Sequence, residues 1–506
     1  MRQHRLGWHY VAAAVAAVTL LAACGTQVVN PVTGRTERTV MDEREELALG
    51  AKAHADVLKE YTPLASPGLQ AYVEHLGQQL AAKSHRADLT WTFTVLDSPE
   101  VNAFALPGGY VYVTRGIMAY LDSEADLAGV LGHEIGHVTA RHGAQRATRQ
   151  QTAGFGVLAA TIGGVLLEAA GVGGAARAAS EISQTVAAGH VARYSREQEL
   201  QADQLGAEYL ARSHFDPAHM VEVIQVLKNQ ETYAAEAARA AGRAAPAGPN
   251  WLASHPSSDQ RLQEIKDIAA RLAASSGSWG DEGRERFLRA IDGATFGDSR
   301  DHGVVRGREF FHEPLGIALT APPGYRVANE SERVVIVNAE GNAALLMRLV
   351  PASAGTDHER ILRETLQAAE GRIERLTLPS GLAATRFAGV RRNAQGQSAT
   401  IEATLVTGPE SKVFLLVYAA RDAAALQAAR PALRMAEATF RPLSAADRQA
   451  AKPWRIALVP FPAGGFAELA RKSPLTELAE QQLRLLNGAY GGGAEPRVGQ
   501  LVKTVR

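Results

Sequence analysis

Hydrophobic positions in the first half of the chain recur mainly at helical spacing. Residues three or four apart share one face of a helix, so this spacing predicts amphipathic helices. The predicted helices span residues 42–61, 67–84, 123–142, 195–213, 217–243 and a last stretch that ends near 274. Residues 89–96 and 102–114 alternate instead, the latter about a Pro-Gly-Gly turn, so we expect a small sheet among the helices.

The second half of the chain has a different pattern, and composition shifts at residues 275–280 and again at 298–307. Alternating runs then predict strands at 334–337, 343–350, 399–406 and 413–419, with helices near 357–370 and 422–437. Residues 454–505 predict the order strand, helix, helix, strand. Helices and strands that are segregated along the chain predict the α+β fold class.

The amino terminus has the order of an export signal, in which basic residues precede an apolar stretch at 11–21 that is short for a membrane span. The stretch ends in Leu-Ala-Ala-Cys, where Cys24 is the single cysteine and so has no partner for an internal disulfide. This run resembles the bacterial lipobox, whose cysteine is lipidated after cleavage. We expect residues 1–24 to be a lipoprotein signal peptide; the alternative is a plain secretory signal with a chance cysteine. Gly25 resembles the residue found in lipoproteins sorted to the outer membrane.

Two further segments bear on the membrane. Residues 25–41 are polar and predict a tether. Residues 153–176 are apolar and rich in glycine and alanine, except for Glu168. We expect a helical hairpin near the active site or the lipid surface there; a full membrane span is the alternative, which Glu168 and the glycines disfavour.

Bulk composition excludes several classes of protein. The chain of 506 residues is 46% hydrophobic and 21% charged, which is typical of globular domains and not of disordered chains. Basic and acidic residues both number 53, so the net charge is about zero. Nothing in this balance points to a nucleic acid partner.

The strongest chemical signal is the run His133-Glu134-Ile135-Gly136-His137 inside the predicted helix 123–142. On a helix, positions i and i+4 lie about 40° apart, so both imidazoles project from one face and can chelate one Zn²⁺ ion. Glu134 is rotated about 100° from His133, from where its carboxylate can reach a water bound to the same ion. A solvent-exposed helix with a chance match is the alternative, but the surrounding apolar residues predict burial, where unused polar groups are costly.

A third metal ligand is needed, and the sequence excludes one familiar arrangement. Metzincins place a Gly and a His after the second histidine, where this chain has Ala140 and Gly143. His142 lies nine residues after His133, on the opposite face of the predicted helix. We therefore expect His142 to be a polar contact or a surface residue.

The better candidate lies on the predicted helix 195–213. Glu199 and Asp203 are at positions i and i+4 and so share one face. Glu199 can bind the metal, and Asp203 can accept a hydrogen bond from a ligand histidine. A row of carboxylates on a solvated helix is the alternative reading of this motif.

Together these motifs resemble the HtpX/BepA family of membrane-associated zinc metallopeptidases, which is related to the CAAX prenyl endopeptidases. Residues 98–105 and 108–113 resemble the strands that precede the family's metal helix, and Ser254-His255-Pro256 with Arg261 resembles its downstream His-Pro segment. The resemblance covers about 40–275. It implies a zincin-type domain that holds Zn²⁺ through His133, His137 and Glu199.

The resemblance also implies roles for residues away from the helix motifs. The family aligns peptide substrates along an edge strand by backbone pairing. Asn102, with Ala103 beside it, matches a position that binds the substrate backbone. His255 is implied to act near zinc, as an inhibitory fourth ligand or as an oxyanion partner in catalysis; by spacing alone it is an exposed loop histidine.

The chain departs from the family downstream, because no tetratricopeptide period is present there. The partners of BepA-like proteins are therefore not transferred. Residues 453–506 resemble a divergent LysM module, with Ala463-Gly464-Gly465 in place of its usual Gly-Asp-Thr turn. Peptidoglycan binding by this unit and a purely structural role both remain open.

The sequence thus predicts an α+β protein made of consecutive segments. They are a signal peptide (1–24), a tether (25–41), a mainly helical metallopeptidase domain with a small sheet (42–275), a linker (276–307), a separate α+β domain (308–443) and a LysM-like βααβ unit (453–506).

The predicted function is zinc-dependent hydrolysis of peptide bonds in misfolded or unassembled envelope proteins. The protein is expected to be anchored through lipidated Cys24 at a bacterial membrane. We expect this to be the outer membrane, with the protein facing the periplasm. Protein or peptide substrates and the membrane are the expected partners, and nucleic acid is not. The alternatives are a zinc-containing chaperone or scaffold and a peptidoglycan-associated assembly factor, each with little proteolysis.

Overall fold

The computed structural model describes residues 26–39, 41–147, 194–240, 251, 255, 259–275, 278–330, 333–366, 368–392 and 398–506. The predicted signal peptide with Cys24, the apolar segment 153–176, residues 244–250, and Ser254 and Pro256 beside His255 lie outside these residues.

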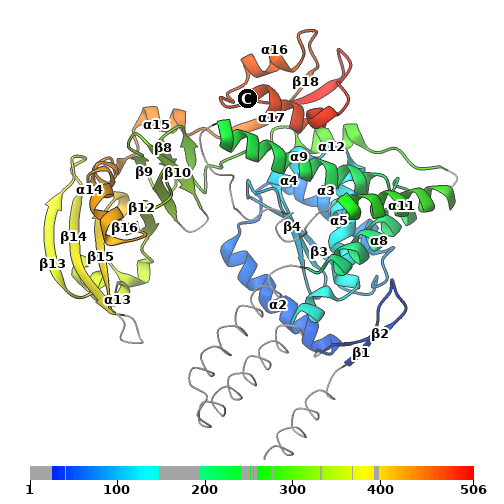
Figure 1. Cartoon of the computed structure of the whole chain (residues 1–506), viewed down its shortest axis with the longest axis horizontal. Helices are drawn as coiled ribbons and strands as arrows, with labels where there is room; N and C mark the ends of the chain where they lie inside the picture. Colours follow the sequence, from blue (N-terminus) through cyan, green and yellow to red (C-terminus); the bar gives the residue numbers. More distant parts are fainter. Residues whose placement is uncertain are drawn as a thin grey trace, which may run out of the picture. The chain divides into compact units, whose positions relative to one another are not determined.

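The chain divides into two units (Figure 1). The first contains the residues up to Ala294 together with Ile456–Arg506, and the second contains Thr295–Arg455. The second unit is therefore inserted into the sequence of the first. The N–H of Gly293 donates to the carbonyl of Ile456, and the N–H of Ile456 donates to that of Ala294, both over 2.9 Å. The chain thus leaves and re-enters the first unit at neighbouring positions.

The first unit begins with a hairpin and two helices. Strand β1 (Thr26–Val29) pairs antiparallel with β2 (Thr36–Thr39). Helices α2 (Glu43–Glu60) and α3 (Pro67–Ala81) follow. Helix α2 starts at a capping box, in which the Asp42 and Glu45 side chains each accept from the other's backbone N–H. Such reciprocal bonds satisfy two donors that a helix start leaves unpaired.

The first unit also contains a three-stranded sheet. Strand β5 (Tyr110–Thr114) is central and pairs parallel with β3 (Thr92–Leu96) and antiparallel with β4 (Ala103–Leu106). The tight β4–β5 turn uses Gly108 and Gly109, whose φ angles of 87° and 96° favour glycine. Strand β4 therefore forms one edge of the sheet, close in sequence to the predicted substrate-binding residues.

Helices make up most of the remaining first unit. In chain order they are α4 (Arg115–Tyr120), α5 (Glu124–Thr139), α8 (Arg196–Arg212), α9 (His219–Ala240), α11 (Asp259–Ser275) and α12 (Arg284–Ile291). Helix α5 is buried along its whole length from Ala125 to Thr139. It ends three residues before the predicted boundary, because Arg141 adopts a φ of 56°, the left-handed conformation that terminates helices.

The last residues of the chain also belong to the first unit. From Ile456 onwards they form most of β18 (Trp454–Pro460), then α16 (Gly465–Lys472), α17 (Ala479–Leu486) and β19 (Leu501–Val505), with β18 and β19 antiparallel. The buried ammonium of Lys503 donates to the carbonyls of Ala119 and Leu121, just ahead of α5. Residues from the two ends of the sequence thus build one unit.

The second unit contains two antiparallel sheets. The smaller has the order β17 (Arg441–Pro442), β9 (Ile317–Thr320), β8 (Glu309–His312) and β7 (Val304–Arg306). The larger has the order β10 (Tyr325–Asn329), β11 (Val334–Asn338), β12 (Ala343–Leu349), β16 (Val413–Ala420), β15 (Ser398–Thr407), β14 (Ala383–Arg392) and β13 (Ala368–Thr377). A short strand, β6 (Thr295–Phe296), pairs with the start of β18.

Helices cover both faces of the larger sheet. Helix α14 (Ala423–Ala438) contributes Leu433 and Ala436 to one apolar core, and α13 (His358–Thr365) contributes Ile361 and Leu362 to the other. A third helix, α15 (Ala445–Ala450), follows β17. The prediction of a helix over 357–370 was too long, because the chain enters strand β13 at Ala368.

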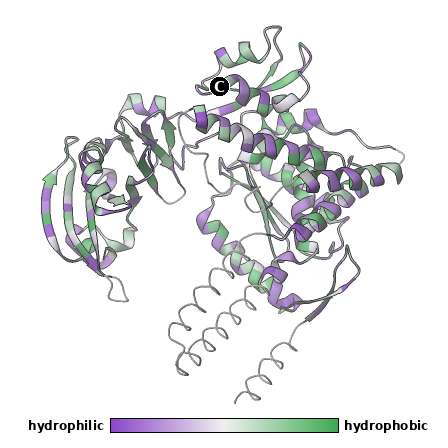
Figure 2. Ribbon diagram, viewed as in Figure 1, coloured by the Kyte–Doolittle hydropathy of each residue, from purple (hydrophilic) through white to green (hydrophobic). Residues whose placement is uncertain are grey.

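Polar and apolar residues alternate around the helices of each unit (Figure 2), as expected of helices that bury one face. Among the described residues, no helix combines the length and the apolar character that crossing a membrane requires. With its helices and separate sheets, the described part of the chain has the mixed α and β class that the sequence predicts.

Candidate metal centre

Helix α5 carries the two histidines and the glutamate of the central motif. Its start is fixed by a capping box, in which Ser123 and Asp126 each accept from the other's backbone N–H. The side chains of His133, Glu134 and His137 are at most 2% exposed. These polar groups therefore sit inside the protein, where they need partners.

Small residues bring α8 against α5 at the motif. A Cβ atom added at Gly136 would lie 2.8 Å from the carbonyl oxygen of Ala202. One turn away, a Cβ atom at Gly132 would lie 3.3 Å from the carbonyl oxygen of Gly206. This close approach explains the small residues within both sequence motifs, since a larger side chain at Gly136 would force the helices apart. It also places Glu199, one turn before Asp203, beside the histidines of α5.

Four buried side chains converge at this point: His133, His137, Glu199 and His255, with ligand atoms all within 4.8 Å of one another. The Nε2 atom of His133 lies 3.0 Å from Nε2 of His137 and 3.2 Å from Nδ1 of His255. The Glu199 carboxylate lies 3.0 Å from His255 Nδ1, 3.5 Å from His137 Nε2 and 3.7 Å from His133 Nε2.

These distances fit a tetrahedral zinc ion. With Zn–N and Zn–O bonds of about 2.0–2.1 Å, neighbouring ligand atoms in a tetrahedron lie about 3.3 Å apart. The five distances in the cluster, 3.0–3.7 Å, bracket that value. The sequence-predicted ligands His133, His137 and Glu199 are thus together, and His255 completes a set of four.

Glu134 points to the same cluster without being part of the ligand set. Its Oε1 accepts a hydrogen bond from the indole N–H of Trp251 over 3.1 Å and lies 3.6 Å from Nε2 of His255. The Trp251 and His255 rings stack, with centroids 4.7 Å apart. The indole therefore fixes one carboxylate oxygen of Glu134, and the sequence offered no signal for this contact.

Asp203 lies directly behind a predicted ligand. Its Oδ1 is 2.8 Å from Nδ1 of His133, so the outer nitrogen of that ring is held and Nε2 faces the cluster. The guanidinium of Arg261 on α11 donates from Nε and Nη2 to the two oxygens of Asp203, over 2.7 and 2.8 Å. Its Nη1 lies 2.8 Å from Oε2 of Glu199. Arg261 thus joins the two carboxylates of α8.

The charges of the cluster suit a cation. Glu134, Glu199 and Asp203 bring three carboxylates, and Arg261 is the guanidinium that contacts two of them. Burial would raise the pKa of Glu199, but His255 and Arg261 outweigh it and lower that pKa. In the same way, Arg261 and His133 overcome burial and hold the pKa of Asp203 far below its usual range. Both groups are therefore ready to act as anions.

The histidines divide into two kinds. Burial, reinforced by the neighbouring His133, His142 and His255, lowers the pKa of His137 well below its ordinary value, which favours the neutral ring that binds metals. Burial would also lower the pKa of His255, but the carboxylates of Glu199 and Glu134 raise it on balance.

The structure changes the interpretation of His142. Helix α5 has already ended, so His142 is not on its opposite face; the ring is fully buried and its Nδ1 lies 2.9 Å from Nδ1 of His137. Its Nε2 lies 3.1 Å from the side-chain oxygen of Gln201, which also accepts from the Asn30 amide over 3.0 Å. The helix end at Arg141, which a helical wheel does not show, decides this placement.

The predicted substrate-binding residues lie at the start of the edge strand β4. Ala103 is fully buried, and Asn102 shares backbone and side-chain hydrogen bonds with Thr114 on β5. The side-chain oxygen of Asn102 is buried and accepts no hydrogen bond. The neighbouring carbonyl of Val101 accepts from the N–H of Trp251 over 3.0 Å. The edge strand is therefore tied to the residue that holds Glu134.

A second group of potential ligands lies at the start of α5. His219 Nδ1 is 2.8 Å from Oδ1 of Asp126 and 3.2 Å from Oε2 of Glu222. Burial would lower the pKa of His219, but the two carboxylates outweigh it and raise the pKa to about 10. Its imidazolium is therefore already the cation of this group, and sequence spacing gave no sign of it.

Comparisons with known proteins match the same region. Residues 67–269, which include all four clustered residues, match Peptidase family M48. The chain is 29% identical over 249 residues to the beta-barrel assembly-enhancing protease of Yersinia pestis, covering 48% of this chain and 47% of that protein. It is 27% identical over 241 residues to the mitochondrial metalloendopeptidase OMA1 of Schizosaccharomyces pombe, covering 47% of this chain and 65% of that protein.

The chain thus spans about half the length of the first curated relatives it matches. Among solved structures, one match is LpqN of Mycobacterium tuberculosis, which is involved in cell envelope biogenesis. The match covers 28% of this chain and 90% of the LpqN chain, at 17% sequence identity. Its TM-score of 0.19 is too low to support a conclusion. The family match agrees with the convergence of His133 and His137 on α5 with Glu199 on α8. The chain therefore contains a peptidase family M48 domain.

Proposed function

We propose that this chain is a zinc-dependent endopeptidase of the bacterial cell envelope, which hydrolyses peptide bonds in misfolded or unassembled envelope proteins. One observation carries the proposal: two buried histidines of α5 and the Glu199 carboxylate of α8 converge with the spacing of a tetrahedral metal site. The match to Peptidase family M48 supports the reaction class.

In this proposal His133, His137 and Glu199 hold the zinc ion. Bound there, zinc would acidify a water molecule and polarise the carbonyl of the peptide bond to be cleaved. Asp203 and Arg261 keep the ligands in place, since Asp203 orients His133 and Arg261 bonds both Asp203 and Glu199.

Glu134 is the proposed general base. Its carboxylate is buried beside the ligand atoms, and Trp251 holds Oε1 from one side. A carboxylate at this position can take a proton from the attacking water and pass it to the leaving amine. The indole contact limits the orientations of Glu134 and so favours one geometry for transfer.

His255 is proposed as a fourth ligand in the arrangement described here. Its Nδ1 is 3.2 Å from Nε2 of His133 and 3.0 Å from the Glu199 carboxylate, as a ligand of the same ion would be. A catalytic zinc ion would keep one position open for water or substrate, so His255 would leave the ligand set before cleavage. In the alternative role, His255 would stabilise the oxyanion after it has left the ligand set.

Strand β4 is the proposed platform for the substrate. It is an edge strand, so an extended peptide can add to it by backbone pairing. The buried, unpaired side-chain oxygen of Asn102 at its start supports a role in accepting a backbone N–H. Peptide substrates would then run past Trp251 towards Glu134.

The envelope location rests on the sequence of the amino terminus, in which Cys24 follows a signal-like stretch. We propose lipid anchoring through Cys24 at the outer membrane. The name of the Yersinia pestis relative, beta-barrel assembly-enhancing protease, supports a role in the envelope. We also propose that residues 453–506 can contact peptidoglycan, on the basis of their resemblance to a LysM module.

Cleavage of labelled casein by the purified full chain tests the activity. We expect cleavage that a chelator abolishes and that zinc restores. Glu134→Gln should lower the rate by roughly 10²–10⁴-fold, the usual worth of a general base, while the zinc content stays at the wild-type level. Glu222→Gln, a matched loss of one carboxylate outside the cluster, is the control and should cleave normally.

Equal cleavage by Glu134→Gln and wild type would overturn the proposed mechanism. Cleavage that persists in chelator would overturn the metal requirement. If the wild type binds zinc but cleaves nothing, while Glu134→Gln supports the cellular function, the chaperone or scaffold alternative holds instead.

A further inference from the structure

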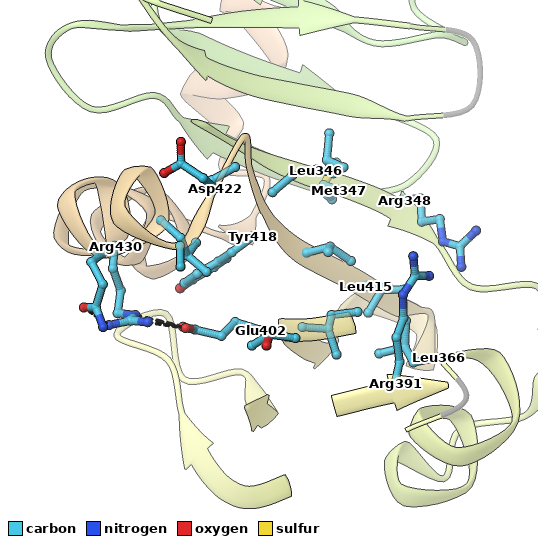
Figure 3. A pocket seen from close by; sticks show the side chains of 18 of the residues that line it. Leu346, Met347, Arg348, Leu366, Arg391, Glu402, Leu415, Tyr418, Asp422 and Arg430 are labelled. Atoms are coloured by element: carbon cyan, nitrogen blue, oxygen red, sulfur yellow. Dashed lines mark hydrogen bonds and ion pairs between the residues drawn. The ribbon is translucent and has the colours of Figure 1, made fainter. Parts of the chain in front are cut away.

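A groove of about 830 Å³ lies in the second unit, outside residues 67–269 (Figure 3). Its walls come from the central strands β12, β15 and β16 of the larger sheet and from the first turns of α14. Cavities of about 300–1,000 Å³ are typical of sites for small organic ligands. The groove is therefore large enough for a ligand and independent of the metal cluster.

The floor of the groove is apolar. It is formed by aliphatic side chains of the three strands and of the residue after α13: Leu346, Leu366, Ile401, Leu415 and Val417. Leu346 and Val417 are only half-buried, so part of this floor is exposed to solvent. Apolar surface that stays exposed in a concave site gains free energy when a ligand covers it.

Two arginines line one side of the groove, and both are exposed (Figure 3). Within the described part of the chain, Arg348 on β12 and Arg391 on β14 make no hydrogen bond or ion pair. The groove has a third arginine, Arg430, but its guanidinium is bound to the carboxylate of Glu402, with Nε to Oε2 at 3.0 Å. The positive charge of Arg348 and Arg391 is thus available to a ligand, and that of Arg430 is neutralised.

The strand arrangement restricts what can bind. Strand β12 pairs with β11 and β16, and β15 pairs with β14 along its length but with β16 only from Glu402 onwards, so the free strand edge at the groove is limited to the start of β15 and the end of β16. An extended peptide would find only a short run of backbone partners there. The occupant must therefore gain its affinity mainly from an apolar body and a negative end.

We propose that this groove binds a free single-chain anionic amphiphile, with its acyl chain along Leu346, Leu415 and Val417 and its carboxylate or phosphate on Arg348 and Arg391. Guanidinium groups form strong paired hydrogen bonds with such anions. Each buried methylene adds apolar contact along the floor.

Titration calorimetry of the full chain with laurate below its micelle concentration tests the proposal. We expect saturable binding of one laurate per chain and no binding of dodecyltrimethylammonium, which has the same tail and the opposite charge. Arg348→Glu combined with Arg391→Glu should weaken laurate binding by about tenfold or more, because two charge-assisted contacts become repulsive. Arg372→Glu is the matched control, since Arg372 is exposed on β13 of the same sheet but does not line the groove.

A second variant tests the floor by itself. Val417→Lys places a long polar chain in the groove and should also weaken laurate binding, with circular dichroism and thermal unfolding confirming that the chain is folded. Laurate binding that is unchanged in both variants overturns the proposal. So does binding of anionic vesicles, but not of laurate monomers, because that result would indicate a membrane-facing surface and not a ligand groove.

Discussion

The start and the middle of helix α5 each carry a group of histidine and carboxylate side chains with metal-like spacing. In the middle, His133, His137, Glu199 and His255 are all buried. At the start, Asp126 and His219 are buried, but the Glu222 side chain is 60% exposed. Residue types and distances alone do not separate these two groups.

The difference lies in what each ring nitrogen faces. In the middle of the helix, Nε2 of His133 and Nε2 of His137 face each other over 3.0 Å, and burial lowers the pKa of His137. At the start, one nitrogen of His219 faces two carboxylates, which raise its pKa to about 10. In the first group two ring nitrogens of α5 are turned towards each other, and in the second the ring nitrogen is turned towards carboxylates, which hold it as an imidazolium. A ligand set for zinc is therefore recognised by ring nitrogens that converge on one point, and acidic residues near a histidine are not enough.

Replacing one histidine by glutamine in each group should give the largest difference, which is a difference in zinc binding. We expect elemental analysis to find one zinc per wild-type chain and one in His219→Gln. His137→Gln should lose zinc affinity by more than the roughly 10–100-fold that the loss of an outer contact costs. Two zinc ions in the wild type, or full zinc in His137→Gln, would remove the distinction between the groups.

Arg261→Met should have the next largest effect, on stability. It leaves Glu199 and Asp203 without their guanidinium in a buried site, so the free energy of unfolding in urea should fall by about 3–5 kcal/mol. Arg286 provides the control, because it pairs with Glu124 and Asp281 while 54% exposed, and Arg286→Met should cost at most about 1 kcal/mol. Equal losses in the two variants would mean that the cluster does not depend on its buried charges.

Per pH unit, the smallest of these effects is the pH dependence that His219 adds. Its pKa rises from 6.5 in the unfolded chain to about 10 in the folded one, so its contribution is complete below pH 6.5 and is lost as pH rises towards 10. The unfolding free energy of the wild type should fall, relative to His219→Gln, by at most about 1.4 kcal/mol per pH unit in that window. Parallel profiles for the two proteins would show that the imidazolium is absent.

Helical spacing was enough to predict which side chains of α5 and of α8 share a face. Positions i and i+4 place His133 with His137, and Glu199 with Asp203, whatever the rest of the fold does. It could not place Trp251 or His142, because Trp251 arrives from another part of the chain and His142 depends on where α5 ends. Only the resemblance to a family linked His255 to the histidines of α5.

Strand β13 shows why the fold was harder to predict than the site. Its sequence, AAEGRIERLT, contains helix-forming residues and continues the helical pattern of α13, so we expected a helix through residue 370. Pairing with β14 along its length makes it a strand instead. Contacts between distant segments override local propensity in such cases, and the local sequence pattern does not reveal such contacts.

The insertion of the second unit has a consequence for the order in which the protein is made. Lys503, near the last residue, holds the carbonyls of Ala119 and Leu121 just ahead of α5. A ribosome adds roughly 5–20 residues per second, amino terminus first. The segment that completes the first unit therefore emerges only after the whole second unit, tens of seconds after the HExxH helix at the slower rates. Throughout that interval the residues just ahead of the metal-site helix are without the ammonium group that holds their carbonyls in the folded protein.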